Sequence, residues 1–218
     1  MTITTILCDL DGTLVDSQRD IAVAFQRAWR MAFGGIPPSP VAIAQHIGKP
    51  LAEMISELGG MLSASSLSTF LSAYQQTFSR QDARLTRPYP GVLLTLQALS
   101  TFTLGVVTTK EPAQAEIVLR QLGLITFFQH VQGGILGLRL KPAPDTILAA
   151  LAALRCTPPH ALMVGDTPAD IMAGKAAGTM TCAVTYGFGK REALLQCAPD
   201  YVIESFGELV DLVRESRG

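Results

Sequence analysis

Charged residues are scarce in this chain, and their scarcity excludes a disordered protein. They make up 16% of the 218 residues, whereas hydrophobic residues make up 48%. Disordered segments show the opposite balance, because they cannot bury enough apolar surface to fold. We therefore expect a folded chain with an extensively buried sheet, long enough for one large domain or for one domain that carries a smaller insertion.

A basic stripe is also missing from the sequence. The chain has 17 Lys and Arg against 18 Asp and Glu, for a formal net charge of -1, and its cations are scattered without interleaved aromatic residues. Proteins that bind nucleic acid gather cations to neutralise the phosphates. We therefore expect no nucleic-acid partner.

The N-terminus lacks the features of a targeting segment. MTITTILCDLDG has no basic leader, and an aspartate interrupts its short apolar run. A signal peptide begins with basic residues and a longer apolar stretch, and a membrane span needs roughly 20 apolar residues. We predict neither, expect no membrane partner, and expect the protein in the cytoplasm.

Cysteines with metal-binding spacing are absent too. Cys8, Cys156, Cys182 and Cys197 form no CxxC pair and no cluster with histidine. This argues against a structural zinc site and fits a reducing compartment.

Residues 17–86 carry a helical pattern. Apolar residues recur at spacings of three and four in two stripes, which are Ile21, Phe25, Ala28, Trp29 and Ala32, and then Leu67, Phe70, Leu71, Tyr74 and Phe78. GGIPPSP breaks the chain between them, and a short helix over residues 50–58 precedes Gly59 and Gly60. We predict a small all-α domain here, with the stripes as packing surfaces.

From Pro88 onward short apolar strands alternate with helices. The predicted strands are 103–107, a segment near His130, 161–164 and 180–184, and the predicted helices are 92–99, 113–122, 145–154 and 169–177. Together with an opening strand over residues 3–8, this alternation predicts an α/β fold with a doubly wound parallel sheet. Its two pieces are residues 1–16 and 87–218, interrupted by the helical insertion.

Polar residues follow three of these strands. They are Asp9 and Asp11, then Thr108, Thr109 and Lys110, and then Gly165 and Asp166 with Asp170 shortly after, and Lys141 stands between the last two groups in LKPAPD. Ligands of doubly wound sheets bind beyond the carboxyl ends of the strands. Carboxylates alone suggest a cation site, whereas a lysine and a hydroxyl add donors for phosphate oxygens. The set therefore predicts a phosphate ester bound with magnesium.

Each of these residues also has an ordinary structural explanation. Thr108 could end a strand, Lys141 could be a solvated surface charge, Asp166 could cap a helix, and Asp170 could be a first-turn acid beside the helix dipole. Their joint occurrence at successive strand ends favours one common site.

Four segments resemble, in order, the four signatures of the haloacid dehalogenase superfamily. They are CDLDGTLVDS, VVTTK, LKPAPD and MVGDTPADIMAGKAAG. The chain is most similar to the phosphoglycolate phosphatase-like group, which inserts a helical cap after the first signature, and PYPGV and IGKPL also resemble that group. The resemblance implies a Rossmann-like core, a cap over residues 17–86, a Mg²⁺ cofactor, and hydrolysis of a small phosphorylated metabolite through an aspartyl-phosphate.

The resemblance also implies catalytic and metal-binding roles. Asp9 is then the nucleophile and Asp11 the general acid and base, while Thr108 and Lys141 hold the phosphoryl group. The metal positions are Asp9, Asp11 through its backbone carbonyl, and Asp166, with Asp170 nearby.

Further contacts with the substrate are expected from the turn and from the cap. Backbone N–H groups of the turn from Leu10 to Gly12 are candidate phosphate donors, and Thr109 is a further candidate. Lys49 either meets a substrate carboxylate or is a solvated cation before a helix.

Three alternatives and two departures from the family pattern follow from the same segments. A phosphosugar mutase usually carries an arginine in the cap loop, where this chain has Lys49, and DGV where this chain has DGT. A dehalogenase usually lacks the aspartate at position 11, and a noncatalytic phospho-ligand module would lack Asp9 or Asp11. One departure is GGILGLRLKP, whose residues before Lys141 are apolar except for Arg139, where many relatives are acidic. The other is Cys8, which takes the place of the usual phenylalanine before the nucleophile. A monomer and a homodimer are both left open.

Overall fold

The computed structural model of the chain describes residues 2–81 and 84–215, and it describes side chains for residues 2–77 and 84–215. Residues 1, 82–83 and 216–218 of the predicted domain ranges lie outside the described residues, as does the side chain of Phe78 in the second predicted stripe.

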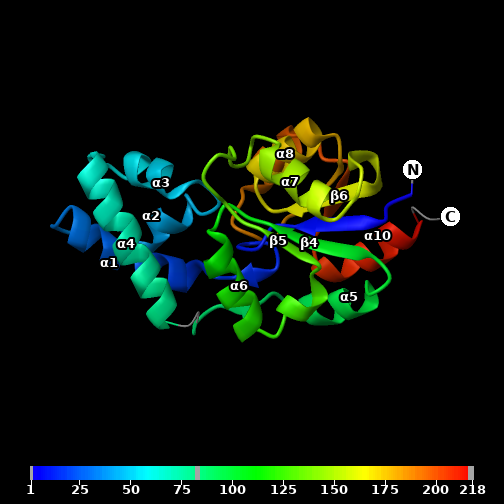
Figure 1. Ribbon diagram of the computed structural model, residues 1–218, viewed down its shortest axis with the longest axis horizontal. Helices are drawn as coiled ribbons and strands as arrows, with labels where there is room; N and C mark the ends of the chain where they lie inside the picture. Colours follow the sequence, from blue (N-terminus) through cyan, green and yellow to red (C-terminus); the bar gives the residue numbers. More distant parts are fainter. Residues whose placement is uncertain (1, 82–83, 216–218) are drawn as a thin grey trace.

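A six-stranded parallel sheet forms the centre of the molecule (Figure 1). Its strands, in spatial order, are β5 (His130–Gln132), β4 (Thr103–Val107), β1 (Thr5–Cys8), β6 (Ala161–Gly165), β7 (Met180–Val184) and β8 (Tyr201–Ile203). Every neighbouring pair is parallel. Along the chain, β4 and then β5 are added on one side of β1, and the chain then crosses to β6 on the other side of β1. This change of direction beside β1 is where such sheets bind ligands, and the predicted doubly wound sheet is confirmed.

Helices cover both faces of the sheet. The helices that pack against the sheet are α5 (Val92–Ala98), α6 (Pro112–Gln121), α7 (Asp145–Ala153), α8 (Pro168–Ala177), α9 (Arg191–Gln196) and α10 (Leu209–Glu215). Short 3-10 helices lie at Ile125–Phe127, Pro158–His160 and Phe206–Glu208. Leu7 packs with α7 and α8, whereas its neighbours Ile6 and Cys8 pack with α5, α6 and α10. This alternation follows from the two-residue period of a strand, and it explains why the buried strands are apolar throughout.

Four helices form a separate group beside the sheet (Figure 1). They are α1 (Gln18–Ala32), α2 (Pro40–Ala44), α3 (Leu51–Glu57) and α4 (Ala64–Gln81). Phe25 of α1 meets Phe70 of α4 edge to face, with 4.9 Å between the ring centroids. The apolar stripes are therefore packing surfaces between helices.

The structure adds elements that the sequence pattern does not predict. Helix α2 begins inside the predicted chain break, because Pro40 stands at the first helical position and Ser39 accepts a hydrogen bond from the Ala42 N–H at 3.2 Å. A short antiparallel pair, β2 (Val15–Asp16) with β3 (Arg87–Pro88), joins the two chain passages between the sheet and the helical group. The segment after β7 adds α9, β8 and α10.

Candidate active site

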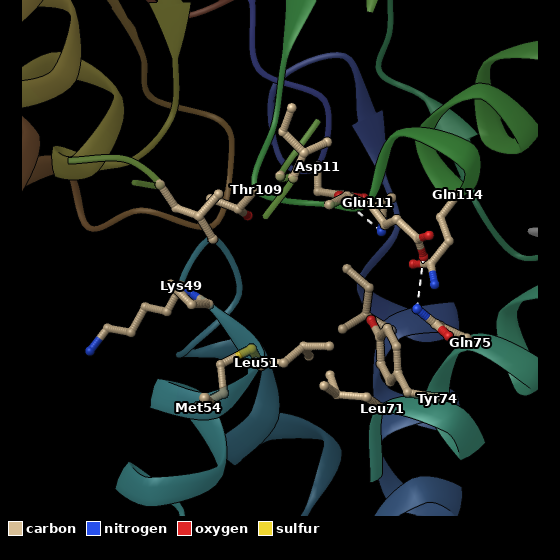
Figure 2. A pocket seen from close by; sticks show the side chains of 18 of the residues that line it. Asp11, Lys49, Leu51, Met54, Leu71, Tyr74, Gln75, Thr109, Glu111 and Gln114 are labelled. Carbon is tan, nitrogen blue, oxygen red and sulfur yellow. Dashed lines mark hydrogen bonds and ion pairs between the residues drawn. The ribbon is translucent and has the colours of Figure 1, made fainter. Parts of the chain in front are cut away.

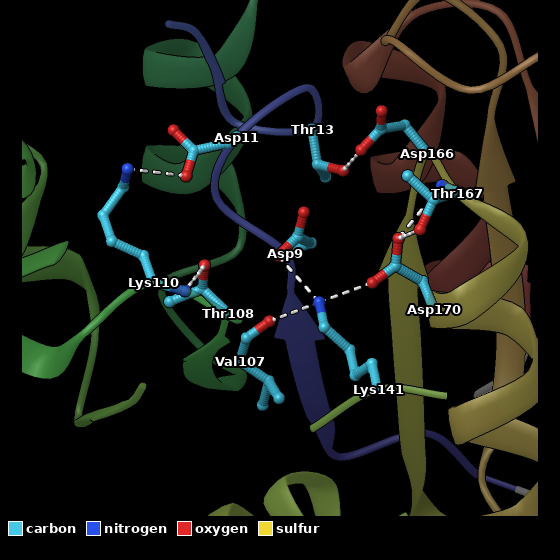
Figure 3. A network of polar contacts seen from close by, with 10 residues as sticks. All are labelled: Asp9, Asp11, Thr13, Val107, Thr108, Lys110, Lys141, Asp166, Thr167 and Asp170. Carbon is cyan, nitrogen blue, oxygen red and sulfur yellow. Dashed lines mark hydrogen bonds and ion pairs between the residues drawn. The ribbon is translucent and has the colours of Figure 1, made fainter. Parts of the chain in front are cut away.

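Polar residues from four distant segments meet at the carboxyl edge of the sheet (Figure 3). Asp9 follows β1, Thr108 follows β4, Asp166 follows β6, and Lys141 precedes α7. All four side chains are buried. These strand ends therefore lie together in the structure, as the sequence predicts.

Lys141 connects two acids at the centre of this edge. Its Nζ donates hydrogen bonds to Asp9 Oδ1 at 2.8 Å, to Asp170 Oδ1 at 2.5 Å and to the Val107 carbonyl at 2.9 Å. Burial alone would lower the pKa of Lys141, but the charges of Asp170 and Asp9 outweigh this and raise it. A fixed positive charge therefore lies directly beside Asp9, and Lys141 is not a solvated surface residue.

Three buried acids surround one point beside Lys141. One carboxylate oxygen each of Asp9, Asp166 and Asp170 lies within 4.8 Å of the others. Burial, followed by the charge of Asp170, raises the pKa of Asp166 to about 7. Burial also raises the pKa of Asp9 well above its usual value, although Lys141 opposes the shift.

The acids outnumber the one lysine among them, so ionising all three is costly unless a further cation is bound. Their donor atoms are all carboxylate oxygens, which hard divalent cations such as Mg²⁺ prefer. The residues present therefore fit a divalent cation at this point.

Asp166 is held in place by the loop after β1 and by the loop between β7 and α9. Its Oδ1 accepts a hydrogen bond from Thr13 Oγ1 at 2.9 Å, and its Oδ2 accepts one from the Phe188 N–H at 2.8 Å. Gly12 has φ +93°, and a Cβ atom at this position would lie 2.3 Å from Asp166 Oδ2. Glycine at position 12 therefore serves both the turn and the close approach of Asp166.

Asp170 is the first-turn acid of α8 that the sequence suggests, and it also contacts Lys141. Its Oδ2 accepts hydrogen bonds from the Thr167 N–H at 3.0 Å and from Thr167 Oγ1 at 2.6 Å, which completes a capping box at the start of α8. Its Oδ1 accepts from Lys141. The same carboxylate therefore begins a helix and positions the lysine.

Asp11 lies apart from the three-acid group and faces another lysine (Figure 3). Ser17 Oγ donates to its Oδ1 at 2.5 Å, and Lys110 Nζ lies 3.1 Å from its Oδ2. The Lys110 side chain is buried. Sequence reasoning noted Lys110 at the strand end but gave it no role, and it missed Ser17, Thr13 and Phe188.

The other predicted contacts with the phosphoryl group are Thr108 and the backbone of the turn from Leu10 to Gly12. Thr108 Oγ1 accepts a hydrogen bond from the Lys110 N–H at 3.2 Å. The Gly12 N–H, which the sequence predicts as a phosphoryl donor, instead donates to the Val15 carbonyl at 2.9 Å and closes its own turn. A phosphoryl contact from the backbone of buried Leu10 stays a prediction.

A cavity of about 470 Å³ lies between the helical group and the sheet edge (Figure 2). Asp11 and Thr109 line it from the sheet side, and Lys49 lines it from the loop before α3. The Lys49 ammonium points away from the cavity and binds Glu57 Oε1 and Oε2 at 2.6 and 2.7 Å. A contact between Lys49 and a substrate therefore stays a prediction.

A helix that crosses a membrane must be both long and predominantly apolar. Within residues 2–81 and 84–215, none is both long and apolar enough to cross a membrane.

Comparisons with known proteins place this site in a family. The family model described as "Haloacid dehalogenase-like hydrolase" matches residues 6–184. The chain is 36% identical to a phosphoglycolate phosphatase of Vibrio vulnificus, with 95% of each chain covered, and 32% identical to the pyrophosphatase PpaX of Halalkalibacterium halodurans, with 98% of each covered.

Solved structures have the same fold. A haloacid dehalogenase-like hydrolase of Streptococcus pneumoniae matches with a TM-score of 0.85 and 28% identity, covering 96% of this chain and 98% of that one. A predicted phosphatase of Clostridium acetobutylicum matches with a TM-score of 0.89 and 25% identity, covering 99% of this chain and 100% of that one.

Proposed function

The chain belongs to the haloacid dehalogenase-like hydrolase family, and from this membership we propose that it hydrolyses a small phosphate monoester through an aspartyl-phosphate on Asp9. It is a phosphatase of the phosphoglycolate phosphatase-like group. The observation that carries the proposed mechanism is the direct contact of Lys141 with Asp9 at the edge of the buried acid group. A carboxylate is a weak nucleophile toward an anionic phosphate, and the lysine offsets that repulsion.

In the first proposed step, an Asp9 carboxylate oxygen attacks phosphorus and the bond between phosphorus and the ester oxygen breaks. Lys141 binds Asp9 Oδ1 and stabilises negative charge on the phosphoryl oxygens. Thr108, at the end of β4, supplies a hydroxyl donor. Thr109 and the backbone of Leu10 remain further candidates for contacts with the substrate, whereas the Gly12 N–H donates to the Val15 carbonyl.

Asp11 is proposed to move the protons. It gives a proton to the departing alkoxide and then accepts one from the water that attacks phosphorus, which breaks the bond to Asp9 and releases inorganic phosphate. Such proton transfer contributes roughly 10² to 10⁴ in rate. Ser17 and Lys110 hold the Asp11 carboxylate in place, and Lys110 stabilises its charge once the proton has left.

Mg²⁺ is the proposed cofactor, held by Asp9, Asp166 and the backbone carbonyl of Asp11, with Asp170 alongside. When bound, this cation neutralises part of the charge on the phosphoryl group. The buried position of the acids and the raised pKa of Asp166 support a site built for a cation.

We further propose the domain division and the compartment. Residues 17–86 are the all-α cap, and residues 1–16 and 87–218 are the core, supported by the pairing of Asp16 with Arg87 where the chain leaves and re-enters the core. A cytoplasmic location is supported by four cysteines that remain as free thiols.

The test is turnover of p-nitrophenyl phosphate with and without Mg²⁺, in the native chain and in Asp9→Asn. We expect turnover that requires Mg²⁺ and is lost in Asp9→Asn. Asp211→Asn, an exposed acid on α10, is the matched control and should retain full activity. Turnover that survives in Asp9→Asn would contradict the proposed mechanism.

A further inference from the structure

Apolar side chains wall the cavity from both the cap helices and the sheet domain. From the cap they are Ile21, Ile47, Leu51, Met54, Leu67 and Leu71, and from the core loop they are Ile135, Leu136, Leu138 and Leu140. This loop belongs to GGILGLRLKP, the segment that is largely apolar where many relatives are acidic. Leu136 is fully exposed and Ile135 is about half exposed. A solvent-exposed pair of this kind, lining a cavity that apolar cap residues also line, favours an apolar ligand.

The two lysines that line the cavity are both engaged by carboxylates. Lys110 is paired with Asp11. The Lys49 ammonium is directed away from the cavity (Figure 2), where it binds Glu57 and lies 3.4 Å from Glu53. A negatively charged ligand would have to draw one of these lysines away from its present partners.

An acid also lines the cavity. Glu111, between Lys110 and α6, accepts a hydrogen bond from Gln75 Nε2 of α4 at 2.9 Å, so this contact joins the sheet domain to the cap (Figure 2). A ligand carboxylate in the cavity would meet the charges of Glu111 and Asp11, and it would lose its hydration against apolar walls.

We propose that the alcohol part of the natural substrate is uncharged and largely apolar. This inference rests on the proposed phosphatase function, which places the phosphoryl group at Asp9 and the departing oxygen at Asp11. Because Asp11 also lines the cavity, the alcohol part extends from Asp11 into the apolar space. The cavity therefore selects against the carboxylate of phosphoglycolate.

Three phosphate esters of similar size test this proposal. n-Propyl phosphate, 2-hydroxyethyl phosphate and phosphoglycolate end in a methyl, a hydroxymethyl and a carboxylate group. With Mg²⁺ present, we expect kcat/KM to fall in that order, with n-propyl phosphate at least about tenfold better than phosphoglycolate. Phosphoglycolate as the best of the three would overturn the proposal.

Removing the charge of Glu111 tests whether this charge opposes a carboxylate on the substrate. Glu111→Gln is expected to raise kcat/KM for phosphoglycolate relative to n-propyl phosphate by about two- to fivefold, because an exposed charge has a modest effect. Glu116→Gln is the matched control, since Glu116 is exposed on α6 and pairs with Arg120. Equal ratios in the two variants would overturn the assigned role of Glu111.

p-Nitrophenyl phosphate separates failure of this inference from failure of the proposed function. If it is hydrolysed with Mg²⁺ and phosphoglycolate is still the preferred ester, only the inference fails. If neither it nor any of the three esters is hydrolysed, the proposed function fails and the inference falls with it.

Discussion

The lysine at the carboxyl edge of the sheet and the lysine on the helical side of the cavity are held in opposite ways. Lys141 is 4% exposed and binds Asp9 and Asp170, which stand 132 and 29 residues away in the sequence. The Lys49 side chain is 40% exposed and binds Glu57, only 8 residues away. The first lysine is fixed by the fold, whereas the second is held by a local contact on the surface.

This difference predicts effects of very different size when each lysine is removed. Breaking a buried ion pair leaves an uncompensated charge and is costly, whereas exposed pairs contribute little. We therefore expect changes at the sheet edge to affect stability and every substrate alike. Loss of the exposed Lys49 pair should change stability and turnover only slightly.

The largest effect is expected from Lys141→Met. Loss of the lysine leaves Asp9 and Asp170 buried without their cation, so the free energy of unfolding without metal should fall by about 3 to 5 kcal/mol. Urea unfolding in EDTA measures this. Lys190→Met, at an exposed position, is the control and should change stability by less than about 0.5 kcal/mol. Similar stabilities of the two variants would contradict the structural contrast.

A smaller effect is expected from Gly12→Ala. The added Cβ would clash with Asp166 Oδ2 at 2.3 Å and would also occupy a positive φ, so we expect a loss of about 1 to 3 kcal/mol and weaker Mg²⁺ binding. Gly59→Ala isolates the backbone contribution, because Gly59 has φ +87° and nothing within 4 Å of an added Cβ. Equal losses in the two variants would show that contact with Asp166 is unimportant.

The pH dependence of stability without metal is the next effect. Asp166 has a folded pKa of about 7, above its unfolded value of roughly 3.9, so the folded state binds more protons between these limits. The free energy of unfolding in EDTA should therefore fall as pH rises toward 7, by at most about 1.4 kcal/mol per pH unit, and then level off.

Two comparisons check the origin of this slope. Urea unfolding in Asp166→Asn should show a flatter pH profile, and saturating Mg²⁺ should oppose the decline because the cation favours the ionised acids. A metal-free native chain that becomes more stable as pH rises from about 5 to 7 would contradict the assignment.

The smallest effect is expected from Lys49→Met. Because its ammonium is held by Glu57 and points away from the cavity, kcat/KM for n-propyl phosphate and for phosphoglycolate should each change less than about twofold. A tenfold loss confined to phosphoglycolate would instead show that Lys49 meets the substrate carboxylate.

The sequence predicts the meeting of Asp9, Thr108 and Asp166 because parallel strands place all their carboxyl ends at one edge. It does not predict the contact of Asp11 with Lys110 or of Asp166 with Thr13 and the Phe188 N–H, since these depend on how loops fold. The resemblance supplied the role of Lys141, because pattern alone leaves it equally suited to the surface.

Short elements and local pairs account for the other omissions. Helix α2 depends on a serine cap and a proline in a segment that otherwise reads as a break. The pairing of Lys49 could have been predicted from the sequence, because Glu53 and Glu57 follow it by 4 and 8 residues. The elements after β7 are too short to produce a clear apolar period.

Asp9 is proposed to carry the phosphoryl group during turnover, and acid quenching traps that covalent intermediate. The chain would be mixed with ³²P-labelled ester and Mg²⁺, quenched in acid during turnover, and digested for peptide mapping. We expect label on the peptide that contains Asp9, with none in Asp9→Asn. Label on any other residue, or turnover of the ester in Asp9→Asn at the native rate, would contradict it.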